Sequence, residues 1–140
     1  MISRFEVQQI SNLFALDWYP RLIKNAGWEP RDQRSLLRAC QGSEIFAAFL
    51  GDQCVGMVRV TGDLVYTALI CDLIVESKFR REGIGTRLME AVLSYCRDLG
   101  VSEVYAVVDW NAKGFYYKTK ERMGSEWMEA WRWQTGSGEL

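Results

Sequence analysis

The sequence predicts a mixed α/β protein, and three observations lead to this fold class. The chain has 140 residues, 49% of them hydrophobic and 25% charged, which is the ordinary composition of one globular domain. Short runs rich in β-branched and aromatic residues alternate with stretches in which apolar residues recur every three or four positions. Glycines stand between several of these segments, where they end helices or form turns. We therefore expect residues 1–140 to form a single domain, with the glycine-rich residues 135–140 as a loose tail.

The elements are expected in the order β-α-α-β-β-β-α-β-α-β. The apolar run at 64–75 is almost uninterrupted, which is typical of a strand buried on both faces. The stretch 83–99 repeats apolar residues with the period of an amphipathic helix and ends at Gly100. Strands are expected at 4–8, 44–50, 54–60, 64–75, 101–108 and 126–134, and helices at 12–26, 30–40, 83–99 and 112–123.

The residue counts exclude several kinds of chemistry. The chain has no histidine, which removes serine–histidine and cysteine–histidine catalysis and every metal site that needs imidazole. Its 17 basic and 18 acidic side chains give a net charge of −1, so nothing favours binding to nucleic acid or to an anionic membrane.

The cysteines and the apolar runs bear on the cellular setting. None of the four cysteines forms a CxxC pair, so we expect neither a zinc site nor a disulfide exchange motif. The chain shows no secretory signal and no apolar run of about 20 residues, the length that spans a bilayer. We therefore expect a reduced, cytoplasmic protein that binds no metal and no membrane.

The segment from Leu73 to Met89 has the features of a phosphate-binding loop. A buried strand ends in a short loop, and Gly83 and Gly85 then open the long helix. Backbone N–H groups at a helix N-terminus have no intrahelical partner, and the helix dipole favours an anion there. Positive charge gathers on the same loop, at Lys78, Arg80, Arg81 and Arg87. The alternative is a tight strand-to-helix turn without a ligand.

These residues match a known family. The pattern Arg80-x-x-Gly83-x-Gly85, preceded by Leu73-x-Val75, resembles the pyrophosphate-binding motif of the GNAT superfamily of acyl-CoA-dependent N-acyltransferases. Residues 109–118 are similar to a later segment of the family, in which an Asn or Asp leads into a helix with an aromatic–tyrosine pair. The order of elements is similar to that family over about residues 4–134.

The resemblance implies a fold and a cofactor. In that fold the central sheet is mixed but mainly antiparallel, and acetyl-CoA lies between two central strands that splay apart, here 64–75 and 101–108. Acetyl-CoA is then a co-substrate, and no metal is required. Ser77 replaces a usual proline and Arg81 a common glycine, which leaves the backbone donors of the loop in place. The implied cofactor-binding residues are Leu73, Val75, Arg80, Arg81, Gly83, Ile84, Gly85, Thr86 and Asn111.

The resemblance also implies a reaction. We expect an N-acetyltransferase that moves an acetyl group from acetyl-CoA to a primary amine of a small molecule or peptide, by direct attack in a ternary complex. An acylated Cys71 is the alternative route, although its apolar neighbours argue against a lowered pKa. Two other functions stay open: a non-catalytic acetyl-CoA-binding regulatory module, and an interaction module that uses a tryptophan-rich edge strand.

Without histidine, carboxylates are the candidates for the general base. Asp72 interrupts a buried apolar run, and burial raises the pKa of a carboxyl group towards the range that suits a base. Its alternative is a structural carboxylate satisfied by backbone N–H groups or by an arginine such as Arg59. Glu76 is expected to cap a helix or to face solvent.

Tyrosine is the candidate for the acid that protonates the leaving thiolate. Tyr116 lies on the apolar stripe of its predicted helix, and the family motif favours it as well. Tyr117 lies about 100° away on the same helix. The alternative is a core tyrosine with a bonded hydroxyl group.

Aromatic residues are the candidates for substrate binding. Trp18, Trp28 and Asp32, with Tyr19, could form a pocket that holds a cationic amine against their rings. The stretch 27–32, with Ser43, also resembles small members of the family that acetylate amines. Packing in the core is the alternative. The expected last strand carries Trp127, Trp131 and Trp133, and such an aromatic edge strand favours a homodimer over a monomer.

Overall fold

A computed structural model describes residues 4–10, 15, 17–106, 115 and 118. The chain divides into two compact units, Met1–Val107 and Val108–Leu140. Of the second unit, the described residues are Phe115 and Lys118, both helical, as the expected helix at 112–123 requires. The expected strand at 126–134 and the tail at 135–140 lie outside the described residues. The single domain stays a prediction.

The first unit contains one five-stranded sheet in the order β1-β2-β3-β4-β5. Neighbouring strands from β1 to β4 are antiparallel, whereas β4 and β5 are parallel. This confirms the mixed, mainly antiparallel α/β fold. The strands are β1 (Glu6–Ile10), β2 (Ser43–Leu50), β3 (Gln53–Thr61), β4 (Thr67–Val75) and β5 (Glu103–Ala106).

Strands β4 and β5 are paired over the described part of β5, so the expected splay between the central strands is not seen there. The recorded β4–β5 pairs run from Thr67–Glu103 to Ile70–Ala106. The next residues after Ala106 lie outside the described ranges, so the splay stays a prediction.

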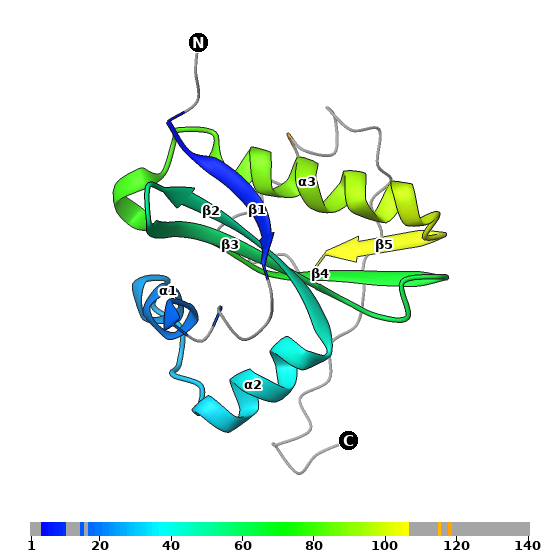
Figure 1. Ribbon diagram of the computed structural model, residues 1–140, viewed down its shortest axis with the longest axis horizontal. Coiled ribbons are helices and arrows are strands. Elements are labelled where there is room, and N and C mark those ends of the chain that lie inside the picture. The colour runs from blue at the N-terminus through cyan, green and yellow to red at the C-terminus, as the bar shows by residue number, and fades with distance from the viewer. Residues whose placement is uncertain (1–3, 11–14, 16, 107–114, 116–117, 119–140) are drawn as a thin grey trace. The chain divides into compact units, whose positions relative to one another are not determined.

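The described residues of the first unit form three α-helices on the two faces of the sheet: α1 (Tyr19–Asn25), α2 (Gln33–Gln41) and α3 (Ile84–Leu99). Helices α1 and α2 lie on one face and α3 lies on the other (Figure 1). Within the described ranges, no helix is both long and apolar enough to cross a bilayer. Helix α2 begins at Gln33 rather than at residue 30, because Asp32 caps its N-terminus.

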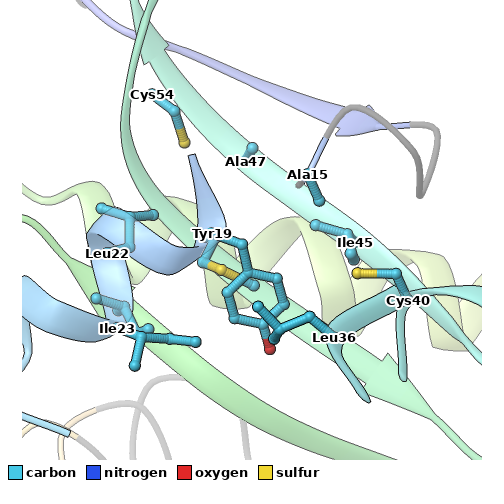
Figure 2. Close-up of a cluster of buried hydrophobic side chains, with 11 residues drawn as sticks. Ala15, Tyr19, Leu22, Ile23, Leu36, Cys40, Ile45, Ala47 and Cys54 are labelled. Carbon is cyan, nitrogen blue, oxygen red and sulfur yellow. The ribbon is translucent and has the colours of Figure 1, made fainter. Parts of the chain in front are cut away.

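The core on the α1/α2 face is built around the ring of Tyr19. This ring lies at the centre of a cluster of buried side chains (Figure 2), and Tyr19 as a whole is fully buried. The other members are Ala15, Leu22, Ile23, Leu36, Cys40, Ile45, Ala47, Cys54, Met57 and Ile74. Trp18 and Trp28 are partly buried and pack against the cluster, as the core-packing alternative expects, and their part in substrate binding stays a prediction.

On the opposite face, a glycine allows α3 to lie close to β3. A Cβ atom at Gly56 would stand 3.1 Å from the carbonyl oxygen of Ile74, 3.2 Å from Ile84 Cγ2 and 3.3 Å from Leu88 Cδ1. Any side chain at this position would therefore push against both the sheet and the first turns of α3. This close approach helps to set where the N-terminus of α3 lies relative to the end of β4.

Candidate functional site

The site begins with a bulge in β4. Met57 of β3 pairs with Ile74, and Arg59 pairs with Cys71, so two residues of β4 stand opposite one residue of β3. The extra residue is Asp72, whose φ of 54° lies in the left-handed region. Left-handed backbone is uncommon for residues other than glycine, but aspartate tolerates it better than most.

The bulge changes which side chains of β4 face α1. Met57 and Arg59 share one face of β3, so their partners Ile74 and Cys71 share that face although they are three positions apart. Ala68 and Ile70, before the bulge, are buried on the α3 face, and Ile74, after it, is buried on the α1 face. The strand thus buries residues on both faces, as the sequence predicts, although several of its residues are only partly buried.

The carboxylate of Asp72 accepts hydrogen bonds from three directions. Arg31 donates to both carboxylate oxygens, from Nη1 to Oδ2 at 2.7 Å and from Nη2 to Oδ1 at 3.1 Å. Arg59 Nε donates to Oδ2 at 3.1 Å, and the hydroxyl group of Tyr19 donates to the same oxygen. The side chain of Asp72 is only 8% exposed. The pairing with Arg59 that the structural alternative requires is therefore present.

These partners decide the pKa of Asp72. Burial alone raises the pKa of the Asp72 carboxyl group, but the hydrogen bonds from Arg31 and Tyr19 and the charges of Arg59 and Arg31 outweigh it and lower the pKa below its ordinary value. The raised pKa expected from the sequence is wrong, because the sequence did not reveal two arginines converging on one carboxylate. The general-base role stays a prediction, and a fully engaged carboxylate of lowered pKa weighs against it.

Sequence reasoning missed the part that Arg31 plays. Its guanidinium stands over the ring of Trp28, 5.8 Å from the centroid, and forms the bidentate pair with Asp72. Arg59 is held in turn by Ser43, whose Oγ accepts from Nη1 at 3.0 Å. A buried aspartate requires a cation, but the sequence offers many arginines and does not show which of them fold against it.

Glu76, at the end of β4, is buried and ion-paired. Its Oε2 accepts from Arg21 Nη1 at 3.1 Å and from Gln53 Nε2 at 3.3 Å, and its residue is 6% exposed. The expectation that Glu76 faces solvent is wrong, and although the residue stands at the N-cap position of the following 3-10 turn, its side chain does not cap that turn. The bulge is the reason, since it turns every second residue after Asp72 towards α1, where Arg21 lies.

Helix α1 also holds the beginning of the following loop. After Glu76 the chain makes a short 3-10 turn, Ser77–Phe79. Asn25, one helical turn beyond Arg21, accepts from the N–H of Ser77 at 2.9 Å and donates to its hydroxyl group at 3.4 Å. Three side chains of α1 thus bind β4 and its exit in sequence order: Tyr19 at the bulge, Arg21 at the strand end and Asn25 at the loop.

The loop ends at an open helix N-terminus. Gly83 precedes α3 with a φ of 84°, and no side chain caps the helix. Among the residues that the structure describes, none has an atom within 4 Å of the place where a Cβ atom of Gly83 would stand. The N–H groups of Ile84, Gly85 and Thr86 have no partner within the helix. A helix of 16 residues therefore presents backbone donors and the positive end of its dipole to open space.

The charges around this N-terminus are positive. Lys78, Arg80, Arg81 and Arg87 are exposed, whereas the acidic Glu82 is paired with Arg4. Arg80 Nε lies 3.4 Å from the carbonyl oxygen of Val75, which places its guanidinium beside the end of β4. Arg81 has a φ of 67°, a conformation that glycine would adopt more easily. Uncapped amides and exposed guanidinium groups are the donor set that fits a diphosphate.

The remaining predicted residues are distributed as follows. Leu73 and Val75 lie partly buried in β4, on either side of Ile74. Asp32 is the N-cap of α2 and accepts from the N–H and the hydroxyl group of Ser35 at 2.9 and 2.7 Å.

Burial raises the pKa of the Cys71 thiol. Asn111, Tyr116, Tyr117, Trp127, Trp131 and Trp133 lie outside the described residues. In the ranges that the structure describes, no group of acidic or cysteine side chains could hold a metal ion.

Two solved structures share this fold. A protein from Xanthomonas campestris pv. campestris, described as belonging to the GNAT family, superposes with a TM-score of 0.76 at 21% identity and covers all of both chains. An aminoglycoside acetyltransferase from an uncultured soil metagenomic sample gives a TM-score of 0.76 at 22% identity, over 94% of this chain and 95% of that one. At such identities the likeness shows the fold.

Sequence comparison identifies the family of this chain. The serotonin N-acetyltransferase 2, chloroplastic, of Oryza sativa subsp. japonica is 28% identical over 117 residues, which are 80% of this chain and 58% of that protein. The chain spans little more than half the length of the curated relatives that it matches. The family model of the GNAT acetyltransferases matches residues 7–119, which are most of the chain. The protein belongs to the acetyltransferase (GNAT) family.

Proposed function

We propose that this protein is an N-acetyltransferase that moves an acetyl group from acetyl-CoA to a primary amine of a small molecule or peptide. The observation that carries the proposal is the uncapped N-terminus of α3 beside the exposed Arg80 and Arg81, at the exit of β4. The names of two relatives, a serotonin and an aminoglycoside acetyltransferase, support an amine as the acceptor.

The residues around Gly83 fit the diphosphate of acetyl-CoA. The guanidinium groups of Arg80 and Arg81 and the N–H groups at the start of α3 would bind its oxygens. Gly83 leaves space beside these donors, since no atom of the described part of the chain lies within 4 Å of the position of a Cβ atom there. The backbone groups of Leu73 and Val75 are the proposed partners of the pantetheine arm, and Asn111 is a further proposed contact.

The chemistry is divided between the co-substrate and the chain. Acetyl-CoA supplies, when bound, an acetyl thioester that is already activated for attack by an amine. An alkylamine of pKa near 10 is only about one part in a thousand neutral at pH 7, so the site must accept a proton from the acceptor. Tyr116 is the proposed donor of a proton to the thiolate. The raised pKa of Cys71 disfavours an acylated thiol and favours direct attack in a ternary complex.

Titration calorimetry with acetyl-CoA tests the cofactor site. The double variant Arg80→Glu with Gly83→Asp places two negative charges at the anion site and a side chain where φ is 84°. We expect its affinity for acetyl-CoA to fall at least about a hundredfold, because charge-assisted hydrogen bonds become repulsions. Arg34→Glu, at an exposed position of α2, is the matched control. Unchanged affinity in the double variant would show that the phosphate site is elsewhere.

A panel of amines tests the reaction. Release of the CoA thiol is measured with serotonin, an aminoglycoside and a peptide with a free N-terminus. Turnover with at least one of them is the expected result. Tight binding of acetyl-CoA without release of the CoA thiol in the presence of any of these amines would favour the non-catalytic binding module. Full turnover in Tyr116→Phe would remove that residue from the acid role.

A further inference from the structure

We propose that Asp72 is a positioning residue: the hydrogen bonds from Tyr19, Arg31 and Arg59 to its carboxylate clamp the bulge of β4 and thereby fix the strand end that leads into the phosphate-binding loop. We name these four residues the bulge clamp. The clamp itself follows from the described contacts. Its effect on acetyl-CoA rests on the proposed function.

The backbone at the bulge requires such a clamp. Asp72 is the extra residue of β4 and holds a left-handed φ of 54°, which is strained for a residue with a Cβ atom. A bulge also interrupts the ladder of backbone hydrogen bonds that would otherwise pin the strand. Side-chain hydrogen bonds are therefore needed to hold this conformation against relaxation to a regular strand.

The clamp comes from three separate parts of the fold. Tyr19 belongs to α1, Arg31 to the segment between α1 and α2, and Arg59 to the neighbouring strand β3. Arg31 uses a bidentate pair, which fixes the orientation of the carboxylate as well as its position. A carboxylate held from a helix, a loop and a strand at once cannot move without disturbing all three.

The bulge decides the register of everything that follows in β4. After it, Val75 pairs with Gly56, and the N–H of Glu76 donates to the carbonyl oxygen of Val55 at 2.8 Å. A slip of one residue would turn each following side chain to the other face of the sheet. Glu76 would then leave Arg21, and the loop from Ser77 to Gly83 would start from a different place. The clamp thus controls the phosphate-binding loop without touching it.

A positioning role and a general-base role predict different results for Asp72→Asn. Loss of a base lowers kcat and leaves both the affinity for acetyl-CoA and the dynamics of β4 unchanged. Loss of the clamp raises the KM and Kd for acetyl-CoA and loosens β4 even in the free protein. Variants of Tyr19 and Arg31, which leave the carboxylate in place, would then have the same effect as Asp72→Asn.

Amide hydrogen exchange in the free protein is the first test, since it needs no cofactor. Asp72→Asn, Arg31→Gln and Tyr19→Phe are each expected to speed exchange at Ile74 and Glu76 at least about tenfold through local opening. Exchange at Ala47, in the middle of β2, is expected to stay as in the parent, as is exchange everywhere in the control Arg34→Gln. If Asp72→Asn fails to fold, Tyr19→Phe and Arg31→Gln decide, since each removes only part of the clamp. Unchanged exchange at Ile74 and Glu76 would overturn the proposal.

Calorimetry with acetyl-CoA is the second test. Asp72→Asn and Arg31→Gln are each expected to weaken the binding of acetyl-CoA. The two effects are not expected to add, because both substitutions break the same hydrogen-bond network. The double variant should therefore bind acetyl-CoA about as tightly as the weaker-binding single variant. Arg31→Lys, which keeps the charge, is expected to restore part of the affinity. Parental affinity in both single variants would overturn the link to the cofactor. If the parent itself does not bind acetyl-CoA, the proposed function is wrong. Hydrogen exchange in the free protein still tests whether the clamp holds the bulge of β4.

Discussion

The sequence predicts that Asp32 binds the substrate, whereas in the structure this residue caps the N-terminus of α2. Its carboxylate caps α2 by accepting from the N–H and the hydroxyl group of Ser35. Asp32→Ala is therefore expected to lower the melting temperature by a few degrees, whereas Asp32→Ser, which can still cap the helix, is expected to retain most of the stability. Thermal unfolding followed by circular dichroism measures both.

The same pair of variants separates capping from substrate binding. If Asp32 only caps the helix, the serine variant keeps the KM for the amine, because the negative charge has no part in binding. A raised KM in Asp32→Ser at parental stability would assign the carboxylate to the substrate. Glu29→Ala, in the same exposed loop, is the control for loss of a nearby charge.

Asp72 shows how much a single residue reveals from sequence. A charged residue inside an apolar run had to be either functional or paired, and Arg59 could be named as a partner because it lies on a neighbouring strand. The other partners, Tyr19 and Arg31, lie 53 and 41 positions away in the chain. Local patterns carry no information on such pairs, so the lowered pKa could not be predicted.

At the scale of elements, α3 could be predicted and the irregularity of β4 could not. The apolar period of α3 is long and regular, and Gly100 ends it in a left-handed conformation with a φ of 74°. In β4 the apolar run is almost uninterrupted in the sequence, so it gives no sign of the bulge that divides the buried side chains of this strand between the two faces of the sheet. The bulge depends on tertiary contacts of Asp72, and no glycine marks it.

The packing of α3 on β3 leads to a prediction for Gly56. Gly56→Ala places a Cβ atom 3.1 Å from a backbone oxygen of β4 and about as close to two side chains of α3, so these neighbours must shift, and we expect the helix to shift with them. We expect a loss of about 1–3 kcal/mol in the free energy of unfolding, which is typical of overpacking. Because the N-terminus of α3 moves with the helix, the Kd for acetyl-CoA should rise as well. Urea unfolding and calorimetry measure the two effects.

Gly42→Ala is the matched control for this substitution. Gly42 ends α2 with a φ of −94°, and an added Cβ atom would only reach ordinary contact distances of 3.8 and 3.9 Å. This variant is expected to keep both the stability and the affinity of the parent. Equal stability of Gly56→Ala and Gly42→Ala would show that α3 adjusts without cost.

At the scale of the whole molecule, a net charge of −1 conceals a local excess of positive charge. Lys78, Arg80 and Arg81 are exposed around the N-terminus of α3, and the nearby Glu82 is engaged by Arg4. The basic residues of this loop are therefore available to an anion, while the molecule as a whole neither attracts nor repels one at long range. Under the proposed function, recognition of the diphosphate then depends on this loop and the N-terminus of α3.

This arrangement predicts that binding of acetyl-CoA depends on salt. The Debye length falls from about 10 Å at 0.1 M salt to about 3 Å at 1 M, so exposed guanidinium groups lose much of their attraction for phosphates over that range. Between these two concentrations we expect the Kd for acetyl-CoA, measured by calorimetry, to rise about tenfold. Acetylpantetheine, which lacks the phosphates, should bind with an affinity that hardly changes. The double variant Arg80→Gln with Arg81→Gln should bind acetyl-CoA more weakly and with a smaller dependence on salt. Equal salt dependence in the parent and in this variant would mean that other charges bind the diphosphate.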